Sequence, residues 1–316
     1  MLSIIIPCYN SEKYIKGCLD SCLNNKYKFE IICINDGSTD DTLNILNDYK
    51  LKYNNIRVLS KQNGGYVSAI KLGILNAKFN YIMFMGSDDI LLNNIIDNVC
   101  EEIITNKPDY ICFNAQLNKK NQIQKDPDSC IEKYIFEGNI SFSDLIKKYT
   151  TDTKIIFHRD TCKCFKKSLN IQYFGKYGIY GDDTFSIMNA ASSYSFSFLP
   201  ITGYQITIRE DSISYNEVSG NKRVDSIYCL IKLVSFINKK KLNKIPNSYL
   251  QKYFNKLLSL LYNAICKDRM SLSLIIATKK VLFYSCFYCR TDLSKNMTFC
   301  FLFPILYKIV YKIKYK

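Results

Sequence analysis

Two adjacent carboxylates, Asp88 and Asp89, follow an apolar run at residues 81–85 and the short link Gly86-Ser87. The run has the length of a buried strand. Carboxylates at the carboxyl end of such a strand project into the crevice where open α/β sheets bind ligands. Their oxygens suit Mg²⁺ or Mn²⁺, which keep waters and accept substrate phosphates as further ligands. The pair therefore predicts a metal site for a phosphorylated substrate, although Ser-Asp-Asp is also common in turns and helix caps.

Three further loops carry polar groups after predicted strands. They are Pro7-Cys8-Tyr9-Asn10, Asp36-Gly37-Ser38 and Asn63-Gly64-Gly65. Because the loops that follow parallel strands collect at one edge of a sheet, we expect them to meet the acid pair. They supply an aromatic ring, a carboxylate that can accept from a base N–H, and backbone amides, as a nucleotide diphosphate requires. The sequence has no G-x-G-x-x-G turn and no phosphate loop of the G-x-x-x-x-G-K-[ST] type, so a metal is the expected substitute.

The first 118 residues alternate short apolar runs with helical segments. Strands are predicted at residues 2–7, 29–35, 56–60 and 81–85, and helices at 12–23, 42–53, 67–77 and 92–106. Ser11 is predicted to cap the first helix, and Thr39 or Asp40 the second. This rhythm is typical of an α/β fold, a mixed but mostly parallel sheet with helices on both faces. Later segments predict a helix at 184–192, strands at 196–200 and 204–208, and mainly helical structure from 222 onward.

The charge of the chain is concentrated near its C-terminus. Of 316 residues, 47% are hydrophobic, and the net charge is +15. Residues 237–316 hold 16 basic and two acidic side chains, a net charge of +14. Together with the aromatic run at 299–311, this composition favours contact with an anionic membrane surface over nucleic acid, since no nucleic-acid-binding motif is recognisable. A solvated basic helical face is the simpler alternative.

Neither a membrane span nor an export signal is evident. No apolar stretch reaches the roughly 20 residues that cross a bilayer, and the N-terminal segment lacks a basic region before its apolar run. We therefore expect a cytoplasmic protein, peripheral on the inner face of the membrane. The 14 cysteines are scattered, which indicates reduced and mostly buried thiols. A lone Cys286-x-x-Cys289 in a chain with one histidine, His158, does not predict a zinc site.

The four loops resemble the signature blocks of family 2 glycosyltransferases. The blocks, in chain order, are Ser-Ile-Ile-Ile-Pro-Cys-Tyr-Asn at 3–10, Ile-Asn-Asp-Gly-Ser-Thr-Asp-Asp-Thr at 34–42, Gln-Asn-Gly-Gly at 62–65 and Phe-Met-Gly-Ser-Asp-Asp at 84–89. Weaker blocks at 179–185 and 204–214 resemble the family's Glu-Asp-x-x-Phe segment and a later arginine-serine loop. The resemblance implies a GT-A fold and transfer with inversion at the sugar, and it fades beyond about residue 221.

The resemblance also implies roles for matching residues. Those expected to contact the nucleotide-sugar are Pro7, Tyr9, Asn10, Asp36, Gly65, Asp88 and Arg209. Asp36 would accept from the uracil N–H, and Asp89 would be the main metal ligand, with Asp88 beside it. Asp183 would be the general base, next to Asp182, and Arg209 could instead meet the acceptor.

Three positions depart from the family pattern. Many members have an acid where this chain has Gly86, so two carboxylates are left for the metal. The usual Glu-Asp pair is Asp182-Asp183 here, which leaves the base open by one residue. An Arg-Asn pair common in the third helix is Ile70-Lys71, so a phosphate role for that helix is in doubt.

We predict a metal-dependent inverting glycosyltransferase that moves one sugar from a UDP-sugar to a saccharide acceptor. The resemblance implies single addition, because processive members of the family carry a Gln-x-x-Arg-Trp motif and this chain has no tryptophan. Its expected acceptor is polyprenyl-diphosphate-linked, in bacterial surface-polysaccharide assembly. Residues 1–221 would form the catalytic domain, divided at residue 118 into donor and acceptor halves, and 222–316 a basic helical region. A polyprenyl-phosphate glycosyltransferase, a non-catalytic nucleotide-sugar binder and a nucleic-acid binder are the alternatives.

Overall fold

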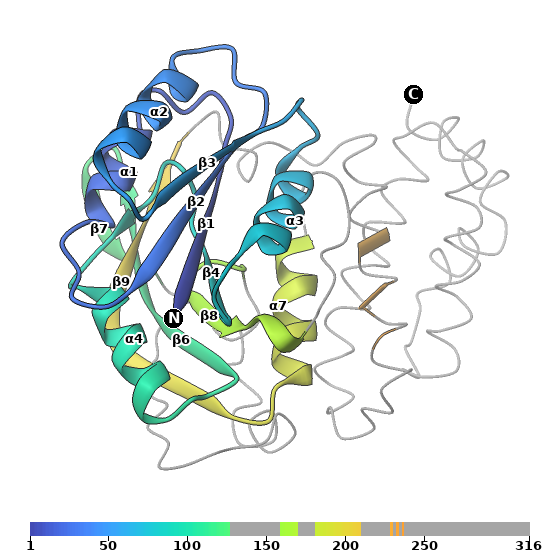
Figure 1. The fold of residues 1–316 in the computed structure, drawn as a ribbon. Helices are drawn as coiled ribbons and strands as arrows, with labels where there is room; N and C mark the ends of the chain where they lie inside the picture. Colours follow the sequence, from blue (N-terminus) through green and yellow to red (C-terminus); the bar gives the residue numbers. More distant parts are fainter. Residues whose placement is uncertain (127–158, 170–180, 210–227, 230–231, 234–235, 237–316) are drawn as a thin grey trace, which may run out of the picture.

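The structure is a computed structural model that describes residues 1–126, 159–169, 181–209, 228–229, 232–233 and 236. These residues build one mixed β-sheet between two layers of helices (Figure 1). The predicted α/β class, with a mostly parallel sheet covered on both faces, is confirmed. Of the expected helical region at 222–316, the structure describes only residues 228–229, 232–233 and 236, which are helical. The basic residues at 237–316, the Cys286-x-x-Cys289 pair and the predicted boundary at residue 221 lie outside the described residues.

The sheet places the ends of its parallel strands at a common edge. Its strand order is β3-β2-β1-β4-β8-β6-β9-β5, with β7 paired to β6. The parallel N-terminal strands are β1 (Leu2–Cys8), β2 (Phe29–Asn35), β3 (Ile56–Ser60) and β4 (Tyr81–Phe84). The remaining strands are β5 (Ile90–Leu91), β6 (Tyr110–Lys119), β7 (Gln122–Lys125), β8 (Lys163–Lys166) and β9 (Phe196–Ile208).

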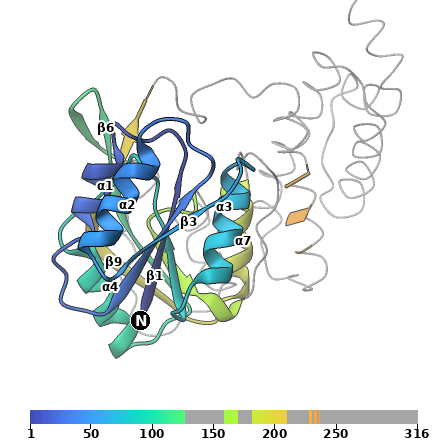
Figure 2. The same cartoon turned by 45° about the horizontal axis from the view of Figure 1, so that its top comes forward.

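The helices cover the sheet in two groups, which Figures 1 and 2 show on opposite sides of the strands. One face carries α1 (Ile15–Ser21), α2 (Thr42–Lys52) and α4 (Ile95–Thr105), and the other carries α3 (Tyr66–Asn76) and α7 (Gly181–Ser192). Side chains alternate along each strand. In β1, Ile5 faces the α3 and α7 layer while Ile4 and Ile6 face the other. Both faces bury apolar side chains, which is why the strands are continuous apolar runs.

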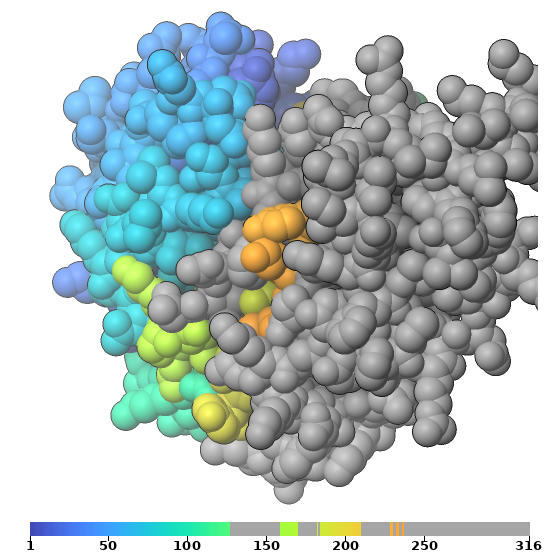
Figure 3. Space-filling model, turned by 90° about the vertical axis from the view of Figure 1, so that its right-hand side faces the viewer, coloured from blue at the N-terminus to red at the C-terminus, as the bar shows by residue number. Residues whose placement is uncertain are grey.

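A short segment within 228–236 adds to the α3 and α7 layer. Leu233 is buried in the same apolar cluster as residues of α3 and α7, and Phe236 packs against that cluster. In the space-filling view, this segment, coloured orange, is visible at the side of the molecule (Figure 3). The apolar core on this face therefore receives side chains from beyond β9.

The predicted strands at 196–200 and 204–208 are wrong as separate elements. They form one strand, β9, which runs parallel to β6. Its register shifts near Asn114, since Leu199 pairs with Phe113 and Thr202 pairs with Asn114. The shift leaves Pro200, which has no backbone N–H, at an irregularity of the ladder, where proline is tolerated.

Two helix starts also differ from the prediction. The Ser11 hydroxyl donates to the Tyr9 carbonyl at 3.3 Å and caps nothing, and α1 begins later, at Ile15. The N-cap of α2 is Asp41, not the predicted Thr39 or Asp40, and its side chain makes no capping bond; Asp40, one residue earlier, accepts from the backbone N–H of Thr42 through its Oδ1 at 3.1 Å. Helix α7 begins at Gly181, so Asp182 and Asp183 lie within its first turn instead of preceding it.

The cysteines that the structure describes agree with the expectation of reduced, buried thiols. All nine are buried and free of disulfides. Burial raises the pKa of the Cys22 and Cys112 thiols to about 12, so both stay protonated and unreactive at neutral pH. Within the described part of the chain, no helix is long and apolar enough to span a membrane.

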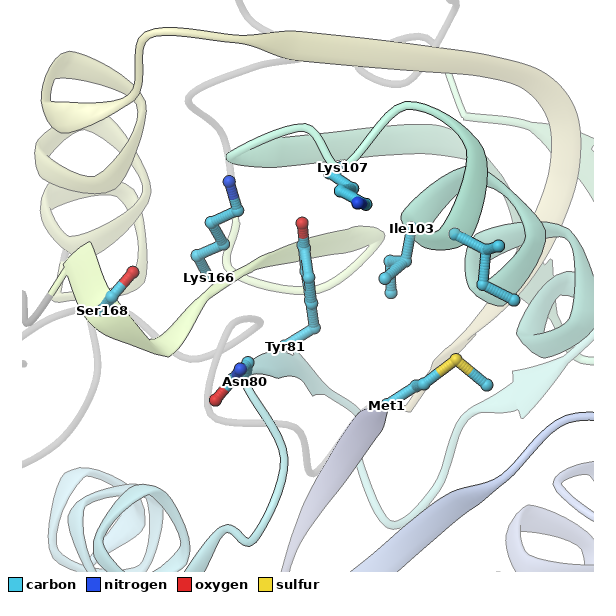
Figure 4. Close-up of a pocket in the computed structure, with 8 residues that line it drawn as sticks. Met1, Asn80, Tyr81, Ile103, Lys107, Lys166 and Ser168 are labelled. Atoms are coloured by element: carbon cyan, nitrogen blue, oxygen red, sulfur yellow. The ribbon is translucent and has the colours of Figure 1, made fainter.

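A cavity of about 760 Å³ lies at the amino-terminal ends of β1 and β4. Figure 4 shows its walls, which include Met1, Tyr81, Ile103 and Lys166. The Tyr81 hydroxyl donates to the Pro108 carbonyl at 2.8 Å, and Lys166 pairs with Asp109 at 2.8 Å. The loops with the predicted site residues follow the carboxyl ends of the same strands. The cavity is therefore at the opposite edge of the sheet from the predicted chemistry.

Candidate active site

The acid pair lies on a tight turn after β4. The backbone N–H of Asp89 donates to the Gly86 carbonyl at 3.2 Å, which closes the turn. The Ser87 hydroxyl lies 2.7 Å from that of Ser11, in the loop after β1. These contacts join the loops that follow two neighbouring strands, as the sequence predicted. Asp88 and Asp89 are thereby fixed at the carboxyl edge of the sheet.

Asp89 is held by strand β9, far away in the sequence. Its Oδ2 accepts from the Tyr204 hydroxyl at 2.7 Å, and its Oδ1 accepts from the backbone N–H of Thr207 at 2.9 Å. The Tyr204 hydroxyl also accepts from the Gly86 N–H at 2.9 Å. Asp89 is only 7% exposed. Tyr204 thus ties the carboxylate and the turn that carries it into one network, and the sequence motifs gave no sign of this role.

Burial sets the protonation of Asp89. Burial and, to a lesser extent, the charge of the neighbouring Asp88 raise the pKa of this carboxyl from 3.8 to about 7. The hydrogen bonds from Thr207 and Tyr204 act in the opposite direction because they stabilise the carboxylate. Without a cation, Asp89 is therefore close to half-protonated at neutral pH. A bound cation would favour the charged form.

Asp88 pairs with an arginine at the end of β9. The Nε of Arg209 lies 2.8 Å from Oδ2 of Asp88, and its guanidinium carbon is 4.8 Å from the centre of the Tyr14 ring. A guanidinium at this distance from a ring is attracted by the ring's π face. The structure therefore brings Arg209 to the acid pair, and Tyr14, which the sequence did not single out, supports it.

The donor set of the acid pair fits a hard divalent cation. Mg²⁺ and Mn²⁺ sites commonly use one or two carboxylates and complete their shell with waters and substrate phosphates. Asp88 and Asp89 supply two such carboxylates, and no group of three or more His, Cys, Asp or Glu side chains occurs among the residues that the structure describes. The described residues thus provide an incomplete shell, with positions left for water or for ligand oxygens.

Gly86 explains why this chain has two acids and not three. A Cβ at this position would lie 2.5 Å from Oδ2 of Asp89 and 3.0 Å from Oδ1 of Asp88. An acidic side chain at residue 86 would therefore collide with the carboxylates it accompanies in other members. The glycine at residue 86, noted in the sequence as a departure from the family pattern, therefore agrees with the lack of space for a side chain in this turn.

Gly86→Ala is expected to displace Asp89 and weaken divalent-cation binding by about 10- to 100-fold, the usual loss when a support of a metal ligand is removed. Overpacking should also lower the free energy of unfolding by about 1–3 kcal/mol. Titration calorimetry with Mn²⁺ and thermal denaturation measure the two effects. Gly17→Ala is the matched control, because a Cβ there meets only Ile90 Cδ1, at 3.5 Å. Equal metal affinity in both variants would contradict the expectation.

Asp36 is buried and organises the Gly-Gly turn. Its Oδ1 accepts from the Gly64 N–H at 3.0 Å and from the Lys61 ammonium at 2.6 Å, and its Oδ2 accepts from the Gly65 N–H at 2.8 Å. Gly65 has φ +83°, a conformation that favours glycine. A carboxylate offers about four acceptor sites. The three internal donors leave Asp36 capacity for one further N–H, such as that of a base.

The loop after β1 lies beside Asp36. The Asp36 N–H donates to the Cys8 carbonyl at 2.9 Å, and Pro7 is in register with Ile34 of β2. Asn10 adopts φ +49° and its side-chain oxygen accepts from the Thr39 N–H at 2.9 Å, so this amide serves the turn. Tyr9 is 51% exposed. An exposed ring at this edge is available for stacking and is not needed by the core.

The predicted base lies in the first turn of α7, and the second turn of this helix is joined to residues that precede β8. The Ser186 hydroxyl donates to the Arg159 carbonyl, and the buried Lys163 ammonium donates to the same carbonyl at 2.7 Å. Asp160, which also precedes β8, accepts from the Tyr66 hydroxyl at 2.8 Å, at the start of α3. The structure places Asp182 and Asp183 in the first turn of α7 but does not describe the Asp183 side chain. Its role as base stays a prediction, and His158 lies outside the described residues.

The fold and this site define a class: an α/β protein with an acid pair and a buried, loop-organising aspartate at the carboxyl edge of its sheet. Residues 3–174 match the family described as Glycosyl transferase family 2, more than half of the chain. The chain belongs to this family.

Several curated relatives share this N-terminal region. Poly(ribitol-phosphate) beta-glucosyltransferase of Bacillus spizizenii is 36% identical over 173 residues, which are 53% of this chain and 25% of the relative. Chondroitin synthase of Pasteurella multocida is 42% identical over 110 residues, 34% of this chain and 11% of the relative. Glycosyltransferase GlyG of Streptococcus pneumoniae is 34% identical over 116 residues, 36% of this chain and 38% of the relative. The chain thus spans well under half the length of each.

Solved structures share the fold over nearly the whole chain. Staphylococcus aureus TarS 1-349, in complex with UDP-GlcNAc, has a TM-score of 0.69 and 19% identity, and the match covers 98% of this chain and 88% of TarS 1-349. The mannosyltransferase PcManGT of Pyrobaculum calidifontis, in complex with GDP-Man and Mn²⁺, has a TM-score of 0.52 and 12% identity, with coverage of 99% and 86%. At these identities the likeness establishes the fold, and the predicted GT-A architecture is confirmed.

Proposed function

We propose that this protein is a metal-dependent inverting glycosyltransferase that moves one sugar from a UDP-sugar to a saccharide acceptor. The observation that carries the proposal is the acid pair, partly exposed Asp88 and buried Asp89, at the same sheet edge as Asp36 and its Gly-Gly turn. Asp36 would bind the base of a nucleoside diphosphate, and the incomplete cation site would bind its diphosphate. The matching relatives transfer sugars, as their names state.

The donor would lie across the carboxyl ends of the N-terminal strands. Tyr9 would stack on the base, Pro7 would border it, and Asp36 would accept its N–H with the remaining acceptor site. Asn10 and Gly65 would hold the two loops that border the nucleoside. Asp88 and Asp89 would hold Mn²⁺ or Mg²⁺, which neutralises charge on the departing diphosphate when bound. Uridine is favoured because TarS, which has the same fold, was crystallised with UDP-GlcNAc.

In the reaction, Asp183 would take the proton of the acceptor hydroxyl. The acceptor oxygen forms a bond to the anomeric carbon while the bond from that carbon to the β-phosphate oxygen breaks on the opposite face. The configuration at the sugar inverts, and the nucleoside diphosphate leaves with the electron pair. Asp182, one residue earlier on α7, is the alternative base.

The acceptor class is proposed from the relatives and from charge. The names of two relatives refer to polymers: poly(ribitol-phosphate), a polyol-phosphate chain, and chondroitin, a polysaccharide. The net charge of +14 in residues 237–316 favours an anionic membrane surface, and with it a polyprenyl-diphosphate-linked acceptor on the inner face of the membrane. We therefore propose a role in surface-polysaccharide assembly.

A thermal-shift panel of nucleotide-sugars tests the donor and the metal together. UDP-sugars are expected to raise the melting temperature only with Mn²⁺ or Mg²⁺, because the ion completes the diphosphate site. A ligand at 100 times its dissociation constant stabilises a protein by about 2.7 kcal/mol. GDP-, CDP- and dTDP-sugars at equal concentration, and metal alone, are the controls. Stabilisation by GDP-sugars alone would overturn the choice of uridine, and no shift with any nucleotide would overturn the donor site.

A further inference from the structure

Arg209 lies against the acid pair where a cation is expected. Its Nε is 2.8 Å from Oδ2 of Asp88, and the two side chains are 27% and 20% exposed. Its guanidinium packs over Tyr14 at 4.8 Å. The contact is thus partly shielded from solvent on one side by a ring and on the other by the turn that carries the acids.

Strand β9 supplies this cation together with the other partners of the pair. Tyr204 and Thr207 donate to Asp89, and Arg209 follows the last residue of the strand. One strand therefore provides a hydroxyl, a backbone N–H and a positive charge to two adjacent carboxylates. In the metal-free protein, the positive charge of Arg209 thus compensates part of the negative charge of the acid pair.

A divalent cation and the guanidinium cannot both occupy Asp88 Oδ2 favourably. Like charges at contact distance repel, and this repulsion is strong where solvent is partly excluded. Metal entry therefore has to be linked to departure of Arg209 from this oxygen. A diphosphate offers the displaced guanidinium an alternative partner, because arginine binds phosphate oxygens with paired hydrogen bonds.

We propose that Arg209 is an internal competitor of the metal: it holds Asp88 in the metal-free protein and transfers to the diphosphate when metal and nucleotide bind. The proposal rests on the proposed function. The protein should then bind the metal ion weakly when nucleotide is absent. Metal and nucleotide should bind cooperatively, because each favours the state in which Arg209 has left Asp88. By linkage, the coupling is reciprocal.

Arg209→Gln tests the competition in the full chain. Without nucleotide, Mn²⁺ is expected to bind at least fivefold more tightly to this variant than to the wild type, measured by titration calorimetry or by the EPR signal of free Mn²⁺. The cooperativity between Mn²⁺ and UDP should shrink by a similar factor. Equal Mn²⁺ affinity in the two proteins would overturn the proposal.

Arg159→Gln separates displacement from general electrostatics. Arg159 pairs with Asp126 at 2.6 Å, and its charge acts on Asp89 without contacting Asp88. We expect less than a twofold change in Mn²⁺ affinity in this variant. A gain as large as that of Arg209→Gln would show that only long-range charge matters, and would overturn the displacement.

The Nε–Hε resonance of Arg209 gives a direct readout, assigned by its loss in Arg209→Lys. It is expected to shift on addition of Mg²⁺ with UDP, and a metal-saturated protein with an unmoved resonance would contradict the proposal. Failure of the proposed function looks different: neither wild type nor Arg209→Gln would bind Mn²⁺, with or without UDP. That result would overturn both proposals, whereas equal binding overturns the competition alone.

Discussion

Asp183→Asn is expected to lower kcat by about 10²- to 10⁴-fold, the usual contribution of a positioned general base. An asparagine has nearly the same shape but cannot accept the proton of the acceptor hydroxyl. Donor binding should persist, because the carboxylates assigned to the nucleotide and the metal lie on loops after β2 and β4. We therefore expect a loss in turnover with the Michaelis constant for the donor changed by less than about threefold.

Steady-state kinetics with the UDP-sugar selected in the thermal-shift panel measure this effect. Asp182→Asn is the matched comparison, since it makes the same change one residue earlier in the first turn of α7. A larger loss in Asp182→Asn would transfer the role of base to that residue. Near-normal turnover in both variants would favour a phosphate acceptor, which needs little base catalysis, and so the polyprenyl-phosphate alternative.

Asp89→Asn is expected to abolish metal-dependent transfer and, at pH 8, to stabilise the free protein. Asp89 has its pKa raised to about 7 in the folded state, against about 4 when unfolded. Between about pH 4 and pH 7 the folded state keeps a proton on Asp89 that the unfolded state has released. The contribution of Asp89 to the free energy of unfolding therefore falls as pH rises through this range and is not regained above about pH 7. Each pKa unit corresponds to about 1.4 kcal/mol, so neutral asparagine should recover on the order of a few kcal/mol.

Thermal denaturation of both proteins from pH 5 to pH 9, without metal, measures this prediction. The stability gain of the variant should grow up to about pH 7 and then level off. Asp48→Asn, at an exposed position of α2, is the control and should show no such trend. A gain that does not depend on pH would mean that burial does not hold Asp89 protonated in the folded protein.

Much of the donor-side architecture could be predicted because its signals are local. The strands β2 and β3 have the predicted bounds, since each is a mainly apolar run, Phe-Glu-Ile-Ile-Cys-Ile-Asn and Ile-Arg-Val-Leu-Ser, between turn residues. The loops that follow these strands meet at one edge because parallel connections require it. For the same reason Asp36 and Gly65, which are 29 residues apart, were expected to be neighbours and are hydrogen-bonded.

The acid pair's own partners could not be predicted in this way. Tyr204 and Asp89 are 115 residues apart, and nothing in the spacing of either segment specifies that β9 runs beside this turn. The break at Pro200 suggested two strands, whereas an irregular ladder with β6 accommodates the proline in one. The constraint at Gly86 is likewise a matter of packing, because only the positions of the two carboxylates reveal that a side chain has no room.

The contacts of β9 also bear on how the protein is made. Chains emerge from the ribosome N-terminus first, at about 5–20 residues per second. The 115 residues between Asp89 and Tyr204 therefore take on the order of ten seconds to synthesise. During that interval the nascent chain carries both acids without the hydroxyl, amide and guanidinium that hold them. A chain truncated before Tyr204 would contain the four N-terminal blocks and still lack the contacts that hold the proposed metal ligands in place.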